Sequence, residues 1–243
     1  MEQRLDKLLC SQSEISRADA GRLIRTGRVT VGGKPCRDPA RKLDPAAQPV
    51  AVDGKPVGYA EHLYLMLNKP AGILCVSRDP KAPTVIDLVP PEYRRRGLFP
   101  AGRLDKDTRG LTLITDDGVL AHEILSPRHH IPKTYLAVLD RLPDEASLDR
   151  LRAGITLESG AVFRPAEITV ADAATRTVEV ILHEGQYHEI KRMFAAVGCP
   201  VIGLRRIAMG SLLLDESLPE GQCRPLTEQE KIGILSEKSS KKR

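Results

Sequence analysis

Residues 101–118 read AGRLDKDTRGLTLITDDG, a charged loop followed directly by an apolar strand pattern. Arg103, Lys106 and Arg109 flank Asp105, and their charge would keep its carboxylate ionised, as a nucleophile or an electrostatic stabiliser requires. A strand over 111–115 would give the loop a rigid support. The same residues are also consistent with a solvated turn in which Asp105 only pairs with neighbouring arginines, so this stretch alone leaves both interpretations open.

Short apolar segments lie on both sides of this loop. Their patterns predict strands over 63–68, 73–77, 111–115, 134–139, 166–171, 177–184 and 201–209. Capping residues and helical spacing predict helices that begin near Asp117, after Asp144, at Gln186 and at Thr227, the last ending near Leu235. Strands interspersed with helices in this way predict an α+β domain around a large mixed, mainly antiparallel sheet.

The first 58 residues have a different pattern, with two short helices and a strand. Leucines at helical spacing predict a helix from Leu5, and Ser16 is the expected N-cap of a second helix that Gly27 ends. Residues 28–31 then alternate like a strand and run into a turn at Gly32 and Gly33.

Positive charge is concentrated in the same region. Residues 17–42 include eight basic and two acidic side chains, a net charge of +6, whereas the whole chain carries +5. Such a concentration is typical of a phosphate-binding surface, although a solvated basic face has the same composition. With no Trp, three Phe and five Tyr, the chain cannot form a broad platform for stacking bases. The basic residues that we expect to contact RNA here are Arg17, Arg22, Arg25 and Arg28.

RLDKLL at 4–9 and SRADAGRLIRTGRVTVGGKPCRDPARKL at 16–43 carry a specific resemblance. This pattern resembles the small RNA-binding module first named in a ribosomal protein of the small subunit and also found in tyrosyl-tRNA synthetases. The resemblance covers about residues 2–58 and implies that the second helix and the following loop contact structured RNA. Prolines and glycines from Pro45 to Gly58 then predict a linker region.

Four longer motifs carry a second resemblance. In chain order they are LYLMLNKPAGILC at 63–75, AGRLDKDTRGLTLITDDG at 101–118, SPRHHIPKTYLAVL at 126–139 and EGQYHEIKRMFAAVG at 184–198. This series resembles the pseudouridine synthases of the small-subunit ribosomal RNA type, and the likeness covers nearly the whole chain. It implies an RNA-binding domain at 1–58, a linker at 59–62 and a catalytic domain at 63–235. The polar composition of residues 236–243 predicts a disordered basic tail.

The same resemblance implies roles for particular residues. Asp105 matches the catalytic aspartate, and Arg103 matches an arginine that fills the space left by a flipped nucleotide. Tyr135 matches the tyrosine that packs on the flipped uracil and assists proton removal, although the strand pattern alone favours a core tyrosine. Lys191 stands where many relatives have an arginine paired with the aspartate. Arg192 is the competing candidate for that ion pair, and otherwise an RNA contact.

The chemistry that the resemblance implies is uridine isomerisation, which needs no redox cofactor and no energy source. We expect no cofactor and no metal, because the sequence has no nucleotide-binding loop and no cluster with ligand spacing. His129, His130 and His188 are therefore expected to be solvated or to face RNA. One carboxylate can serve either through a covalent adduct or by stabilising an elimination pathway, and the target base must be flipped out of its stack. Lys69 is either a phosphate contact or a structural residue.

The leading hypothesis is a pseudouridine synthase, an isomerase that modifies 16S ribosomal RNA during ribosome biogenesis. The alternatives are an enzyme acting on 23S RNA of the large subunit and a non-catalytic rRNA-binding assembly factor. We expect a monomer that acts on small-subunit RNA, either free or in an assembly intermediate. Five scattered cysteines without a C-x-x-C pair argue against a disulfide framework, and the lack of long apolar runs favours a cytoplasmic protein without membrane contact.

Overall fold

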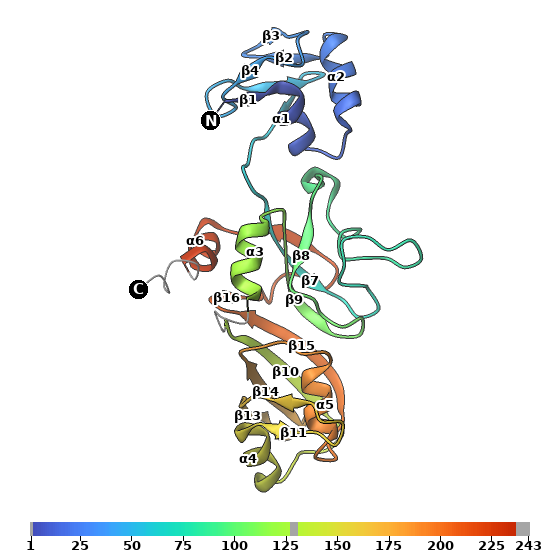
Figure 1. The fold of residues 1–243 in the computed structure, drawn as a ribbon, viewed down its shortest axis with the longest axis vertical. Coiled ribbons are helices and arrows are strands. Elements are labelled where there is room, and N and C mark those ends of the chain that lie inside the picture. Colours follow the sequence, from blue (N-terminus) through green and yellow to red (C-terminus); the bar gives the residue numbers. More distant parts are fainter. Residues whose placement is uncertain (1, 127–130, 237–243) are drawn as a thin grey trace. The chain divides into compact units, whose positions relative to one another are not determined.

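The computed structural model describes residues 2–126 and 131–236, and the chain forms two compact units (Figure 1). The first unit takes in the chain up to Leu63 together with Val89–Leu98, a segment that the sequence assigned to the second domain. The second unit contains Tyr64–Leu88 and the chain from Phe99 onward. His129, His130 and the expected tail beyond Ser236 lie outside the described residues.

The first unit packs two helices against a small sheet. Ser16 caps the second helix, since its Oγ accepts a hydrogen bond from the Asp19 N–H at 3.1 Å, which confirms the predicted start. The core is formed by the apolar faces of both helices and the strands, including Leu8, Ile24 and Val29. The helices are α1 (Leu5–Ser11) and α2 (Arg17–Arg25), the four-stranded sheet has the order β3 (Lys34–Pro35), β2 (Val29–Val31), β5 (Val50–Val52) and β6 (Lys55–Val57), and β1 (Gln3–Arg4) pairs with β4 (Lys42–Leu43).

The linker predicted from Pro45 to Gly58 is wrong in part, because β5 and β6 form an antiparallel hairpin there. Asp53 and Gly54 turn the chain with positive φ, and Pro56 is tolerated because β6 is an edge strand. The glycine and proline at 54 and 56 therefore belong to the turn of a hairpin and to its edge strand, not to a linker. The segment Val89–Leu98 adds the short 3-10 helix η1 (Pro91–Tyr93) to this unit.

The second unit is built on one nine-stranded sheet, which confirms the mixed, mainly antiparallel α+β prediction. The only parallel pairing among its described strands joins β9 to β15, where Arg205 and Arg206 lie opposite Arg109 and Gly110. The order is β13 (Glu167–Asp172), β14 (Thr177–Leu182), β10 (Lys133–Leu139), β15 (Val201–Met209), β9 (Arg109–Thr115), β7 (Tyr64–Lys69) and β17 (Cys223–Pro225), with β16 (Leu212–Leu213) on β15 and β8 (Phe99–Ala101) on β9. A separate pair is β11 (Ile155–Thr156) with β12 (Val162–Phe163).

Four helices border this sheet (Figure 1). Asp117 caps the first of them, since its Oδ1 accepts hydrogen bonds from the N–H groups of Val119 and Leu120 at 3.0 and 2.9 Å. The helices contact β8, β13, β15 and β16 in turn, and they are α3 (Gly118–Leu125), α4 (Glu145–Ala153), α5 (Glu189–Ala195) and α6 (Glu228–Ser236).

Two details of the second unit differ from the sequence predictions. The strand predicted over 73–77 is wrong, because the only pairing there is an isolated bridge between Leu74 and Thr84. The helix predicted from Gln186 begins at Glu189, since residues up to His188 form a turn in which His188 has a left-handed backbone with φ of 51°. Apolar periodicity alone does not reveal either feature, because both depend on which neighbours the backbone meets.

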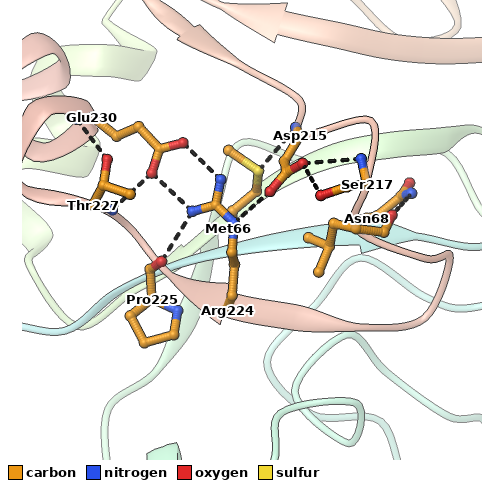
Figure 2. Close-up of polar contacts among 9 residues, drawn as sticks. Met66, Asn68, Asp215, Ser217, Arg224, Pro225, Thr227 and Glu230 are labelled. Atoms are coloured by element: carbon orange, nitrogen blue, oxygen red, sulfur yellow. Dashed lines mark hydrogen bonds and ion pairs between the residues drawn. The ribbon is translucent and has the colours of Figure 1, made fainter.

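A network of ion pairs fastens the last helix to the edge strand β17 (Figure 2). Arg224 makes two 2.8 Å hydrogen bonds to the Glu230 carboxylate and a third to Asp215 Oδ2. Thr227 and Glu230 cap the helix reciprocally, as the sequence predicts, at 3.2 and 2.7 Å. The hydrogen bonds from Arg224 lower the pKa of Glu230 to about 2, so the clamp stays ionised at neutral pH.

The junction of β9 and β15 requires glycine at position 110. Gly110 has φ of 99°, and a Cβ there would lie 2.2 Å from the carbonyl oxygen of Arg206. Only a residue without a side chain lets the two backbones approach this closely. The loop that carries Asp105 enters β9 one residue earlier, at Arg109, so this contact also fixes the end of that loop.

We expect Gly110→Ala to lower the free energy of unfolding by about 2–5 kcal/mol, because it adds both backbone strain and a steric clash. Urea unfolding followed by circular dichroism measures the change. Gly118→Ala is the matched control: it opens α3 with nothing within 4 Å of an added Cβ, and we expect a neutral or slightly stabilising effect. Equal stability of the two variants would contradict the assigned close contact.

Candidate active site

The buried side chain of Lys69 fixes the loop between β8 and β9 through hydrogen bonds to its backbone. This ammonium is fully buried at the end of β7 and donates hydrogen bonds to the carbonyls of Asp105, Lys106 and Thr108 at 3.1, 3.1 and 2.9 Å. Burial lowers the pKa of Lys69, and the nearby acids partly offset this effect. Of the two roles that the sequence left open, the geometry therefore assigns Lys69 the structural one.

Asp105 faces two cationic or basic groups from α5 and the turn before it. Its Oδ2 lies 3.2 Å from Lys191 Nζ, and its Oδ1 lies 3.5 Å from His188 Nε2. Lys191 also contacts Asp107 Oδ1 at 2.6 Å. The ammonium is thus shared by two carboxylates of the same loop, and both it and the Asp105 side chain are half-buried.

This arrangement keeps Lys191 positively charged. Partial burial lowers the pKa of its ammonium, but the hydrogen bonds to Asp107 and Asp105 outweigh burial and raise the pKa above its ordinary value. The same hydrogen bond lowers the pKa of Asp107. A fixed positive charge therefore lies beside the Asp105 carboxylate at neutral pH.

Arg192 points elsewhere, which decides between the two candidates for the ion pair. Its guanidinium stacks over the Phe163 ring with 4.9 Å to the ring centroid, and its Nη1 donates to the Tyr187 carbonyl at 3.3 Å. Lys191 is thus the residue that pairs with Asp105.

Asp105 and Tyr135 line one small cavity. Tyr135 is a buried residue of β10, lying opposite Val180 in the neighbouring strand. Apolar side chains complete the wall, and Arg103 lies exposed at the same cavity. The cavity brings together Asp105, Tyr135 and Lys191, and its other lining residues include Arg103, Leu104, Leu182 and Leu204. A carboxylate, a cation and an aromatic ring between apolar walls suit a flat polar ring bound next to a nucleophile.

His188 and Glu189 are site residues that the sequence did not identify as such. The sequence predicts a solvated or RNA-facing His188, whereas its ring lies against both Asp105 and Tyr187. Glu189 is only 4% exposed and lines the same cavity, and its Oε2 accepts the Gln186 N–H at 2.8 Å. Burial raises the pKa of Glu189 to about 7, with a contribution from Glu184 that Lys133 opposes. The sequence could have indicated Glu189 only as a glutamate in the first turn of an apolar helix, and a surface residue that caps the helix has the same pattern.

The four arginines predicted to bind RNA in the first unit are all exposed, and three of them have acidic partners. Arg22 pairs with Asp19 at 2.7 Å, Arg17 approaches Asp6 at 3.4 Å, and Arg28 pairs with Asp53. Arg25 instead lies over Gly21 on the same helix face, where an added Cβ would come within 3.3 Å of its guanidinium. Contact of the three paired arginines with phosphates would have to compete with these carboxylates.

Within residues 2–126 and 131–236, no group of three or more His, Cys, Asp or Glu side chains is arranged as a metal site would require. No helix in the described part of the chain is long and apolar enough to cross a membrane.

The fold and the cavity define an enzyme of a known family. The chain matches the RNA pseudouridylate synthase family over residues 63–196 and the S4 domain over residues 3–49. The protein belongs to the RNA pseudouridylate synthase family, and both resemblances seen in the sequence are confirmed.

Individual relatives cover nearly the whole chain. The ribosomal small subunit pseudouridine synthase A of Escherichia coli strain K12 is 44% identical over 234 residues, which is 96% of this chain and 100% of that protein. The uncharacterized RNA pseudouridine synthase YtzG of Bacillus subtilis strain 168 is 43% identical, with 96% and 98% covered. A crystal structure of a pseudouridylate synthase matches with a TM-score of 0.65 at 36% identity and covers 95% of this chain and 99% of that chain.

The buried Glu189 carboxyl predicts a pH-dependent stability. Its pKa rises from 4.5 to about 7 on folding, so the folded state favours the protonated carboxyl. The contribution of Glu189 to the free energy of unfolding is therefore fully present below pH 4.5 and is lost as the pH rises through about 7. We expect Glu189→Gln, which stays neutral, to match the native protein near pH 5 and to exceed its stability by up to about 3 kcal/mol at pH 9.

Urea unfolding at pH 5, 7 and 9 measures this difference. The exposed Glu158→Gln serves as control and should show no such trend. A difference between Glu189→Gln and the native protein that stays constant with pH would contradict the assigned burial effect.

Proposed function

We propose that this protein converts one uridine of 16S ribosomal RNA to pseudouridine. The observation that carries the proposal is the Asp105–Lys191 ion pair in a cavity lined by Tyr135. The small-subunit target is supported by relatives named ribosomal small subunit pseudouridine synthase A, which are 42–44% identical over at least 93% of this chain. A catalytically inactive assembly factor would have no need for this constellation.

In the proposed reaction the bond between uracil N1 and the sugar C1′ breaks, the freed base turns, and C5 bonds to C1′. N1 gains a proton and C5 loses one, so the product is an isomer of the substrate. The Asp105 carboxylate stabilises the positive charge that develops at C1′. It does so either by forming a covalent bond to the sugar or by stabilising an elimination pathway. Tyr135 packs on the uracil and assists the loss of the C5 proton, and Lys191 orients Asp105.

The target nucleotide lies inside a base stack, so it has to be flipped into the cavity at a cost of a few kcal/mol. We propose that Arg103, exposed at the cavity, takes the place of the flipped nucleotide. Residues 1–58 dock the RNA, residues 59–62 connect the two domains, and the catalytic domain that follows carries out the reaction. The enzyme acts as a monomer on the RNA, free or in an assembly intermediate.

Asp105→Asn tests the chemistry. We expect it to slow release of the carbon-5 hydrogen from small-subunit rRNA by more than about 1,000-fold, because an amide cannot supply the anion, while RNA binding changes only a few fold. Tritium release from 5-tritiated uridine measures the rate. Asp149→Asn removes an exposed carboxylate of α4 and should leave the rate unchanged. Undiminished turnover by Asp105→Asn would refute the assignment.

The double substitution Arg22→Ala and Arg25→Ala tests docking by the first unit. We expect weaker rRNA binding and a slope of log affinity against log salt that is smaller by about 1 to 2, because fewer counterions are released. The control Arg141→Ala with Arg150→Ala removes the same charge from exposed positions in the second unit. Filter binding between low and high salt gives both slopes. A slope identical to that of the native protein would count against this docking surface.

A further inference from the structure

A second cavity lies next to the catalytic one, and the two share the Asp105 loop and the turn before α5. The residues that border both cavities are Arg103, Leu104, Asp105, Gly185, Gln186 and His188. The second cavity continues along Leu74, Cys75 and Val76 and is also lined by Lys106 and Tyr187. It is therefore placed to receive a group that is covalently next to whatever occupies the first cavity.

Tyr187 is the most exposed aromatic side chain that the structure describes, with 75% of its surface open. Its ring stacks on His188 with centroids 3.8 Å apart and the planes inclined by 18°. Most of the ring stays open to water among the described residues, although exposing a large aromatic surface is unfavourable. The ring is thus held by one neighbour and available to another.

The turn that presents Tyr187 is fixed by three contacts. The Tyr187 carbonyl accepts a hydrogen bond from Arg192 at 3.3 Å, the Gln186 N–H donates to Glu189 at 2.8 Å, and Gln186 Nε2 donates to the Val162 carbonyl at 2.9 Å. His188, in its left-handed conformation, approaches Asp105 at 3.5 Å and so couples the ring's position to that of the catalytic carboxylate. A platform fixed before the ligand arrives loses little entropy on binding.

A positive charge that lines the second cavity suits a nucleic-acid backbone. Lys106 is exposed and has no ion-pair partner among the described residues, unlike Asp107 and Arg109 on the same loop. Sequence-tolerant binding of single-stranded RNA uses this combination of an aromatic face for the base and a cation for the phosphate. One ring suffices for one base, although the scarcity of aromatic residues excludes a longer platform.

We propose that Tyr187 stacks on the nucleobase adjacent to the target uridine, while Lys106 contacts the phosphate of that nucleotide. This inference rests on the proposed function, because it takes the catalytic cavity to hold a flipped uridine. The subsite binds one unpaired nucleotide of any base, since it offers a ring face and a point charge but no pattern of hydrogen bonds.

Tyr187→Ala and Tyr187→Phe test the stacking on transcribed small-subunit rRNA. We expect Tyr187→Ala to raise KM by about 5- to 150-fold, the range for loss of one base–aromatic stack, with kcat retained. Tyr187→Phe keeps the ring face and should stay within about twofold of the native KM. An unchanged KM in the alanine variant, or equal impairment of both variants, would overturn the proposal. Because the side chain is exposed, thermal unfolding should be the same for all three proteins.

Salt dependence separates the two contacts. Lys106→Met should reduce the salt slope of RNA binding by about 1, whereas Tyr187→Ala removes no charge and should leave the slope unchanged. A reduced slope in Tyr187→Ala, or an unchanged slope in Lys106→Met, would overturn the corresponding contact.

A binding measurement without turnover distinguishes this inference from the proposed function. The probe is a uridine heptamer with 2-aminopurine next to the central uridine, whose fluorescence falls when the base stacks. We expect quenching by the native protein and by Tyr187→Phe, and none by Tyr187→Ala. Absence of quenching by the native protein would overturn the stacking site, whereas turnover by Asp105→Asn would refute the catalytic proposal and leave this result standing.

Discussion

The candidate site depends on one buried charge, the ammonium of Lys69. A buried cation is stable only where hydrogen bonds replace its lost hydration, and here the replacement comes from backbone carbonyls of the Asp105 loop. Because those carbonyls turn toward Lys69, the loop has little freedom of its own. The Asp105 side chain is then left to meet Lys191 and His188 from another part of the chain. The carboxylate proposed to act in catalysis is thus positioned by a lysine that contacts only the backbone of its loop.

The carboxylates around the cavity differ in their cationic partners and in their burial. Lys191 divides its charge between Asp105 and Asp107, so neither carboxylate has the ammonium to itself. Burial raises the pKa of Glu189, and the hydrogen bond from the Gln186 N–H and the charge of Lys133 do not outweigh it. One acid of the cavity therefore has a cationic partner while another tends to stay neutral, although both are carboxylates. Differences of this kind are set by the burial and partners of each group rather than by residue type.

The parts of this structure that local sequence determines were predicted, and the parts that depend on distant partners were not. Ser16 and Thr227 cap helices through neighbours three residues away, and the apolar strand after Asp105 is contiguous with it, so these features were visible in the sequence. The apolar run at 73–77 has strand composition, yet only Leu74 finds a bridge partner. The contact of His188 with Asp105 requires a left-handed backbone at a non-glycine residue, and the burial of Lys69 requires a loop some 36 residues further on. Lys191 and Arg192 are neighbours on α5 and point to different sides of the helix. The rotation of the helix about its axis therefore decides that Lys191 and not Arg192 contacts Asp105.

The parallel pairing of β9 with β15 has a consequence for the order in which the chain is made. Strand β9 ends at Thr115, but its neighbour β15 begins only at Val201, and β10, β13 and β14, which lie between them in the chain, form one end of the sheet. On the ribosome the first unit has all its residues once Leu98 has emerged, whereas the second still lacks Lys191 and its central strand. A nascent chain therefore acquires a complete S4-containing unit about 90 residues before it acquires the ion pair of the cavity. A nascent chain that has not reached Lys191 lacks both this residue and the strand β15, on which the proposed reaction depends.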